Sequence, residues 1–176
     1  MNFEMGKHKY KGKKSIVIYF SRADENYAVG VVEKGNTEYL AEFIKEETGA
    51  DLFKVEGKVP YAKDYSTCCE EAKVKHDNNE RPELKSTLGS ISDYEVVYIG
   101  SPVYWGTMPQ EMFTQLEKLD FNGKIVRIFV THEGSGLANI PHDVKELCTG
   151  AIVLEDAFSI KGSSAKDAKR RIEEWI

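Results

Sequence analysis

The sequence lacks the features that would place the chain in a membrane, in a disulfide-rich class or around a metal ion. Its apolar runs are short, and even the run from Ile125 to Val130 is interrupted by Arg127, so none can cross a bilayer. The three cysteines are an odd count, and the spacing of the adjacent Cys68 and Cys69 suits neither a disulfide framework nor a CxxC metal site. The four histidines show no metal-ligand spacing. We therefore predict no membrane span, no metal and reduced thiols.

Two common nucleotide-binding motifs and a secretory signal are missing as well. There is no G-x-x-x-x-G-K-[ST] loop and no G-x-G-x-x-G fingerprint, which disfavours ATP hydrolysis and the usual mode of NAD binding. The basic start of the chain is followed by a strand-length run, without the apolar region and cleavage site of a signal peptide. We expect a cytoplasmic protein.

The composition is that of an ordinary globular domain. The 176 residues are 41% hydrophobic and 30% charged, with a net charge of -5. A chain of this length can bury roughly two thirds of its unfolded surface in one domain. We expect a basic leader over residues 1–14 and a single domain over residues 15–176. The lysines of the leader could form a nucleic-acid arm, but the acidic chain favours a solvated tail, so neither a nucleic acid nor a membrane is expected as a partner.

Strand and helix patterns alternate along the chain. Four short runs rich in β-branched and aromatic residues predict buried strands, at Ser15 to Phe20, Glu95 to Gly100, Ile125 to Thr131 and Ala151 to Ile160. A weaker run, Asp51 to Glu56, suits a sheet edge. Helical patterns lie between them, at Thr37 to Thr48, Asp64 to Asp77, after Pro109, Ile140 to Leu147 and Ala165 to Trp175.

This alternation predicts a three-layer α/β/α domain, doubly wound around a five-stranded parallel sheet, with each crossover helix packed back on the sheet. Ligands of such sheets bind at the carboxyl ends of the strands, where the strand order reverses. The loops that follow the first, third and fourth of these five predicted strands, counted in chain order, are therefore the candidate site.

The first of these loops has the chemistry of a phosphate site. Ser21 and Arg22 end the first strand, and Gly35, Asn36 and Thr37 lead into the first helix. Hydroxyl and amide groups beside the positive end of a helix dipole suit a phosphate monoester. The alternative is an ordinary helix N-cap. The intervening segment, Ala23 to Lys34, is either a small hairpin that flanks the ligand or a surface excursion.

The second loop carries two adjacent aromatic residues in a stretch punctuated by proline and glycine. It runs through Pro102, Val103, Tyr104, Trp105, Gly106 and Thr107. The two aromatic rings cannot both be buried in the sheet, so at least one is expected to face a cleft and to stack on a flat ring system. Such stacking contributes about 0.5 to 1.5 kcal/mol beyond burial. The alternative is that both rings cap the core.

The third loop is rich in small and hydroxyl residues that suit a close wrap around the edge of a ring. Its residues are Thr131, His132, Glu133, Gly134, Ser135 and Gly136. His132 could act as a general base oriented by Glu133, but a local hydrogen bond is the more common role of such a histidine. No catalytic residue is therefore predicted.

The chain resembles the flavodoxin family, and more closely its small flavodoxin-like members, over nearly everything after the leader. The residues that carry the resemblance are Ile16 to Arg22, Gly35 to Thr37, Gly100 to Thr107, Phe121 to Lys124 and Thr131 to Gly136. The resemblance implies a strand order of 2-1-3-4-5 with flavin mononucleotide (FMN) at the carboxyl edge. It implies that Ser21, Arg22, Asn36 and Thr37 hold the phosphate, that Pro102 to Thr107 line the isoalloxazine ring and that Thr131 to Gly136 close its pyrimidine side.

The chain departs from the family pattern in two places, and three functions are considered. The phosphate loop is interrupted by Ala23 to Lys34, and Glu133 brings a carboxylate where small residues are frequent. The expected function is electron transfer between a reductase and an acceptor protein, by a monomer or weak dimer. The alternatives are an FMN-dependent NAD(P)H or quinone oxidoreductase, and a regulatory protein that keeps the fold without flavin.

Overall fold

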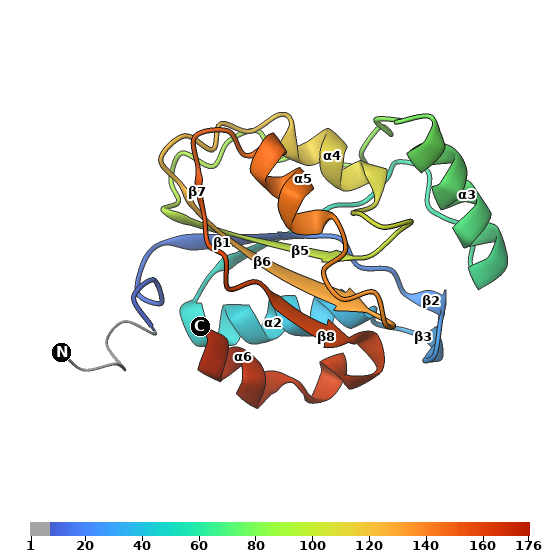
Figure 1. The fold of residues 1–176 in the computed structure, drawn as a ribbon, viewed down its shortest axis with the longest axis horizontal. Helices are drawn as coiled ribbons and strands as arrows, with labels where there is room; N and C mark the ends of the chain where they lie inside the picture. Colours follow the sequence, from blue (N-terminus) through green and yellow to red (C-terminus); the bar gives the residue numbers. More distant parts are fainter. Residues whose placement is uncertain (1–7) are drawn as a thin grey trace.

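A parallel sheet runs through the middle of the molecule, with helices on both of its faces (Figure 1). The computed structural model describes residues 8–176. The strands are β1 (Ser15–Tyr19), β4 (Asp51–Lys54), β5 (Val96–Pro102), β6 (Ile125–His132), β7 (Ile152–Val153) and β8 (Phe158–Lys161). They are all parallel, in the order β4-β1-β5-β6-β7, and β8 also pairs with β6. The predicted fold class and the order 2-1-3-4-5 are confirmed, with β4 at the predicted edge.

The fifth position of the sheet differs from the prediction of one strand over Ala151 to Ile160. It is filled by two short segments, β7 and β8, which pair with different parts of β6. Between them the chain leaves the sheet, and Asp156 accepts a hydrogen bond of 2.9 Å from Nη2 of the buried Arg127 on β6. The predicted strand is therefore interrupted at Asp156, where its side chain pairs with the buried guanidinium of Arg127.

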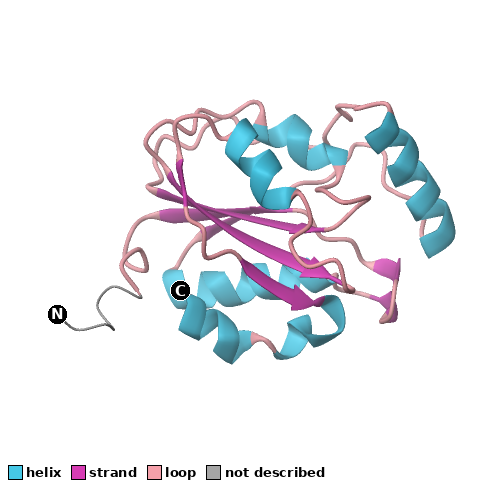
Figure 2. Cartoon of the chain, viewed as in Figure 1, coloured by secondary structure: helices cyan, strands magenta, loops and turns pink. Residues whose placement is uncertain are grey.

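Two pairs of helices cover the sheet (Figure 2). The helices α2 (Asn36–Thr48) and α6 (Lys169–Trp175) lie on one face, and α4 (Gln110–Leu116) and α5 (Ile140–Leu147) lie on the other. Buried Leu40, Ala41 and Ile44 turn α2 toward the sheet, and Gly49 ends it with a left-handed φ of 72°. The predicted last helix is instead the 3-10 helix η1 (Gly162–Asp167) followed by α6.

The helix α3 (Tyr65–Asp77) has the predicted bounds but not the predicted packing. It stands at the carboxyl end of the sheet beside α4, and not on a face of the sheet (Figure 1). Its buried residues are Cys68 and Ala72, which leaves too narrow an apolar stripe to cover a sheet. The expectation that every crossover helix packs back on the sheet is wrong for α3.

The segment between β1 and α2 is a hairpin, one of its two predicted alternatives. The strands β2 (Asp24–Asn26) and β3 (Gly30–Val32) pair in antiparallel fashion. The side-chain Nδ2 of Asn26 donates to the carbonyl of Arg22 at 2.9 Å, so the hairpin is anchored to the end of β1.

Alternate residues of the central strands build two cores, one on each side of the sheet. Val97 and Ile99 of β5 pack with α4 and α5, whereas Val96 and Tyr98 pack with α2 and α6. None of the helices among residues 8–176 is long and apolar enough to pass through a bilayer.

The described part of the basic leader lies against the domain. Lys11 pairs with Glu47 at 3.2 Å and Lys13 with Glu95 at 3.5 Å. Lys7 lies outside the described residues. Most side chains of residues 8–14 are nevertheless exposed, and each of these two exposed ion pairs is worth at most about 1 kcal/mol.

Candidate functional site

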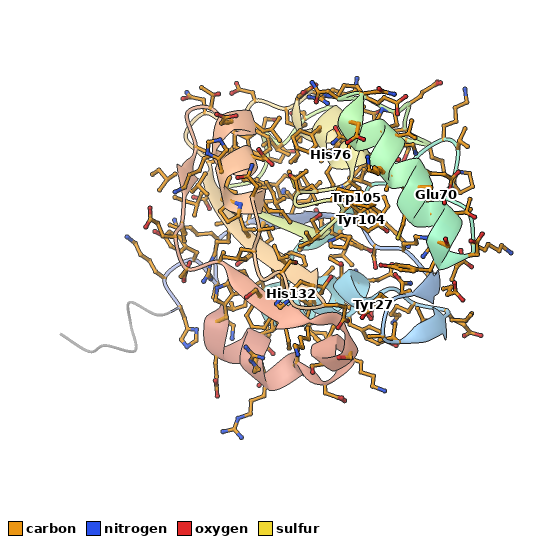
Figure 3. The ribbon with its side chains drawn as sticks, turned by 45° about the vertical axis from the view of Figure 1, so that its right-hand side comes forward. Tyr27, Glu70, His76, Tyr104, Trp105 and His132 are labelled. Carbon is orange, nitrogen blue, oxygen red and sulfur yellow. The ribbon has the colours of Figure 1, made fainter. Side chains whose placement is uncertain are left out.

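A cavity of about 370 Å³ opens at the carboxyl ends of β1, β5 and β6. The three predicted loops contribute ten of its lining residues, namely Arg22, Asn36, Pro102, Val103, Tyr104, Trp105, Thr131, His132, Glu133 and Ser135. Tyr104 and Trp105 approach the cavity beside α3, and Tyr27 and His132 lie across from them (Figure 3). The structure thus brings together the loops that the sequence indicated.

The first loop is held against the start of α2 by a close packing of main chains. Gly35 carries no side chain, and a Cβ atom there would lie 2.2 Å from Oγ of Ser21. Ser21 is buried, and its Oγ accepts a hydrogen bond of 3.1 Å from the main-chain N–H of Glu38. Ser21 therefore caps α2 from outside the helix and does not line the cavity.

Thr37 is also behind the cavity wall. Its hydroxyl lies 2.8 Å from the hydroxyl of Thr131, and this buried contact joins the start of α2 to the end of β6. Asn36, one residue earlier, does line the cavity. The N-terminus of α2 consequently faces the site through Asn36, with Thr37 as its support.

Arg22 brings a cation to the site, but its Nη donors are occupied by main-chain carbonyls. Nη2 donates to Ala62 and Lys63, each at 2.7 Å, and Nη1 donates to Glu25. Arg22 therefore ties the hairpin to the segment before α3. Its charge remains available to an anion, whereas the directional hydrogen bonds of these Nη groups are used within the chain.

The second loop makes a tight turn that projects Trp105. The main-chain N–H of Tyr104 donates to the carbonyl of Thr107 at 2.7 Å, and the two residues between them have positive φ, 55° at Trp105 and 83° at Gly106. A positive φ is unusual for a tryptophan and is typical of functional turns. The indole Nε1 of Trp105 donates to the carbonyl of Cys69 on α3 at 2.9 Å. Trp105 is 49% exposed.

Tyr104 and Thr107 fix this turn to the protein. The Tyr104 ring packs edge-on against Phe20, 5.6 Å away, and Tyr61, 5.8 Å away, and burial raises its pKa well above the usual value. Thr107 is buried and donates its hydroxyl to Asp143 of α5. Gly106 and Thr107 shape the turn and do not line the cavity.

The third loop contributes four residues to the cavity lining: Thr131, His132, Glu133 and Ser135. Gly134 and Gly136 have φ values of 124° and 62°, so their role is to bend the main chain. Nδ1 of His132 accepts a hydrogen bond of 3.0 Å from the N–H of Gly134, which places the proton of the neutral ring on Nε2. This local bond is the role that the sequence analysis favoured for His132.

Glu133 does not orient His132. Its Oε1 instead accepts a hydrogen bond of 3.1 Å from the N–H of Ser163 at the start of η1. Gly162 packs so closely here that a Cβ would lie 2.2 Å from Nδ2 of Asn36 and 2.7 Å from Oε1 of Glu133. Asn36, Glu133 and Gly162 therefore form one polar end of the cavity, beside the N-terminus of α2.

The other end of the cavity is formed by residues that the sequence analysis did not assign. The hairpin contributes Asn26 and Tyr27, and α3 contributes Tyr65, Cys68, Cys69 and Ala72. The insertion and the Cys-Cys pair were visible in the sequence, but nothing in their spacing indicated a shared cavity.

The Cys68 thiol and the Tyr65 phenol at this end stay neutral near pH 7. Burial raises the pKa of Cys68 to about 11. Burial, followed by a hydrogen bond with Cys69, raises the pKa of Tyr65 to about 12. The cavity is thus polar at the α2 end and largely aromatic at the α3 end.

One group of possible metal ligands also comes together among the described residues, although their spacing did not suggest it. His142, Asp143 and Glu146 of α5 offer atoms within 4.8 Å of one another. Asp143, however, accepts hydrogen bonds from Thr107 and Asn139. Its carboxylate thus serves to hold the second loop.

Comparisons with known proteins place this fold in a family. A family model described as flavodoxin matches residues 14–176. A protein from Bacteroides uniformis named as a flavoprotein has a similar solved structure, with 25% identity and a TM-score of 0.73 over 94% of this chain and 98% of that one. A second such protein, from Bacteroides eggerthii, has 25% identity and a TM-score of 0.69 over 92% and 98% of the two chains.

A flavoprotein from Lactobacillus acidophilus, solved in complex with FMN, shares the fold. Its identity is 20% and its TM-score is 0.61, over 89% of this chain and 98% of that one. No curated protein matches the sequence. Because the family model spans the whole of the sheet and the three loops, the chain belongs to the flavodoxin family.

Proposed function

We propose that this chain binds FMN in the cavity and carries electrons between two redox partner proteins, a reductase and an acceptor. The observation that supports this proposal is the polarity of the cavity. Its polar end lies at the N-terminus of a 13-residue helix, where a phosphate is favoured, and its other end is largely aromatic. A ligand with a phosphate at one end and a flat ring at the other fits both.

The residues present fit the two parts of FMN. Asn36 and the first N–H groups of α2 would hold the phosphate, with the charge of Arg22 nearby. Pro102 to Trp105 and the third loop would contact the ring, with Ser21, Thr37, Gly106, Thr107, Gly134 and Gly136 supporting these contacts from behind. When bound, FMN supplies the redox chemistry, and the chain supplies binding, orientation and electrostatics.

The charges around the cavity bear on how readily the ring is reduced. Glu133 places a carboxylate at the cavity wall, and its Oε1 is held by Ser163. Glu133 stands with Asn36 at the polar end, and its fixed negative charge disfavours further negative charge on any ligand in the cavity, a reduced ring included. The net charge of -5 also suits docking on partners with a basic surface.

The test is a titration of the apoprotein with FMN and with riboflavin, which lacks the phosphate, followed by absorbance and flavin fluorescence. Asn36→Ala should weaken FMN binding by about 1.5 to 3 kcal/mol, the worth of a hydrogen bond to a charged group, and should change riboflavin binding little. Tyr39→Ala, on the same helix outside the cavity, is the matched control. Equal losses for both ligands would contradict the placement of the phosphate.

The electron-transfer role needs a separate measurement. The FMN-loaded protein should be reduced by a partner reductase with NADPH, and should not oxidise NADH or NADPH by itself. Rapid direct oxidation with a quinone acceptor would refute the carrier and favour the oxidoreductase. Failure of the apoprotein to bind any flavin would refute both.

A further inference from the structure

The helix α3 is the one crossover helix whose position the sheet does not explain. The other helices bury an apolar stripe against a face of the sheet, whereas α3 stands at its carboxyl end, with α4 as its main helical neighbour. Only Cys68 and Ala72 of α3 are buried, and both line the cavity. The packing of α3 is therefore directed toward the site.

Four residues of α3 line the cavity, and they form one helical stripe. Tyr65, Cys68, Cys69 and Ala72 occupy the positions i, i+3, i+4 and i+7. This spacing puts residues on one face of a helix and is normally the mark of a face that packs on a core. Here the stripe faces a cavity instead. The opposite side of α3 carries Val74, which is 56% exposed.

The hairpin and the second loop complete this end of the cavity. The ring of Tyr27 lies 5.9 Å from the ring of Tyr65, and the indole of Trp105 reaches the carbonyl of Cys69. Charged groups lie at the border of this end: Nζ of Lys73 is 5.8 Å from the Trp105 ring, Glu25 accepts a hydrogen bond of 2.7 Å from the N–H of Tyr65, and Arg22 lines the cavity. Lys73 does not line the cavity. The residues that line the α3 end are thus mostly aromatic rings, thiols and a methyl group, with the Asn26 amide and the Arg22 guanidinium at its border.

The wall formed by α3 is fixed in place by polar contacts with α4 and with the segment before α3. Nζ of Lys75 donates to the fully buried Glu111 of α4 at 2.9 Å. The segment before α3 is held by Arg22, and its Ala62 N–H donates to Glu71 at 2.7 Å. A wall held in this way is preorganised for a ligand, which reduces the entropy lost on binding.

We propose that the stripe Tyr65, Cys68, Cys69 and Ala72, together with Tyr27, is a second wall for the planar ring of the cofactor. The ring is held between this wall and the loops that follow β5 and β6. This inference rests on the proposed binding of FMN and adds to it a set of contacts outside the three loops of the sequence pattern.

The size of the cavity gives this wall a consequence for function. Ligand pockets usually measure about 300 to 1,000 Å³, and the 370 Å³ found here lies near the lower limit. A cavity of this size suits one ligand with a single ring system. With α3 against one face of that ring, a nicotinamide or a quinone would have to approach it from elsewhere.

Larger side chains on the cavity-facing stripe of α3 test the inference. Ala72→Trp should lower the affinity for FMN at least tenfold, and equally for lumiflavin, which has the ring but no phosphate. Val74→Trp adds the same side chain on the exposed face of α3 and should leave both affinities unchanged. Ala72→Leu is a milder variant in case the tryptophan impairs folding, and circular dichroism verifies the fold of each.

Thiol labelling supplies a second measurement. Saturation with FMN should slow the alkylation of Cys69 by iodoacetamide at least tenfold. Mass spectrometry of the peptide that contains Cys69 measures the rate of this reaction. Cys148, which is buried in the core on the α5 side and outside the cavity, is the internal control and should not change. A labelling rate of Cys69 that is independent of FMN would overturn the wall.

The outcomes separate this inference from the proposed function. If the wild-type protein binds FMN and Ala72→Trp binds it equally well, the wall is refuted and the three-loop site stands. If Ala72→Trp keeps its FMN affinity and loses only a reaction with a quinone, the stripe belongs to a second substrate, which also refutes the wall. If the wild-type protein binds neither FMN nor lumiflavin, both proposals are refuted.

Discussion

At the scale of single residues, Gly35 sets how closely the end of β1 approaches the start of α2. A Cβ atom at this position would lie 2.6 Å from the carbonyl oxygen and 2.8 Å from the nitrogen of Arg22. These are main-chain atoms and cannot rotate away, so Gly35→Ala must shift one segment. We expect a loss of about 1 to 3 kcal/mol in the free energy of unfolding, as for other overpacked sites.

Urea unfolding measures this loss, and Gly89→Ala provides the control. No atom lies within 4 Å of the Cβ position of Gly89, so that change should stay within about 0.5 kcal/mol. The shift at Gly35 should also weaken FMN more than lumiflavin, because it displaces the phosphate end. Similar stabilities for the two variants would argue against the close packing of β1 and α2.

The same scale shows what the sequence could predict about the site. The sequence predicted which loops lie close to Gly35, because the loops that follow parallel strands meet at one edge of the sheet. The direction of each side chain was not predictable, because it depends on partners far along the chain. Ser21 turns to the N–H of Glu38, and Thr37 turns to Thr131, 94 residues away. Both therefore lie behind the wall, although their positions in the loop are the expected ones.

At the scale of elements, helix bounds were predicted better than helix positions. The bounds of α3 follow from its local sequence, including Asp64, whose side chain accepts from the N–H of Thr67 as an N-cap. An apolar stripe tells which face of a helix is covered and does not tell what covers it. The place of α3 beside the cavity is decided by distant partners such as Glu111 and Trp105.

The ion pair between Lys75 and Glu111 allows this place to be tested. The Glu111 side chain is fully buried and also accepts a hydrogen bond from Tyr61, whereas the Lys75 side chain is 21% exposed. Lys75→Met should cost about 3 to 5 kcal/mol because it strands a buried carboxylate. Glu111→Gln should cost less, about 1 to 3 kcal/mol, because the lysine can still reach water.

Urea unfolding of the two variants and of the double variant decides the matter, since the double variant should recover part of the loss. The pair Lys73 and Asp77 is the control, because both side chains are about half exposed and its loss should cost about 0.3 to 0.5 kcal/mol. Equal costs for Lys75→Met and Glu111→Gln would mean that the carboxylate is not isolated from water as described.

At the scale of the whole molecule, the two cores share the same strands. In β5 and β6, residues alternate between the core that contacts α4 and α5 and the core that contacts α2 and α6. The loops at the ends of these strands line the cavity, while Tyr98 and Arg127, within the strands, contact Trp175 of α6. Loss of either core would disorder strands on which the other core also depends. We therefore expect one cooperative unfolding transition.

The two tryptophans permit a test, because Trp105 lines the cavity and Trp175 lies on the far side of the sheet. In Trp105→Phe, fluorescence reports on Trp175 alone. FMN at one hundred times its dissociation constant should raise the free energy of unfolding by about 2.7 kcal/mol, and the Trp175 transition in urea should coincide with flavin release. A Trp175 transition that FMN does not move would show that α6 unfolds separately from the site, and that the sheet does not couple the two cores.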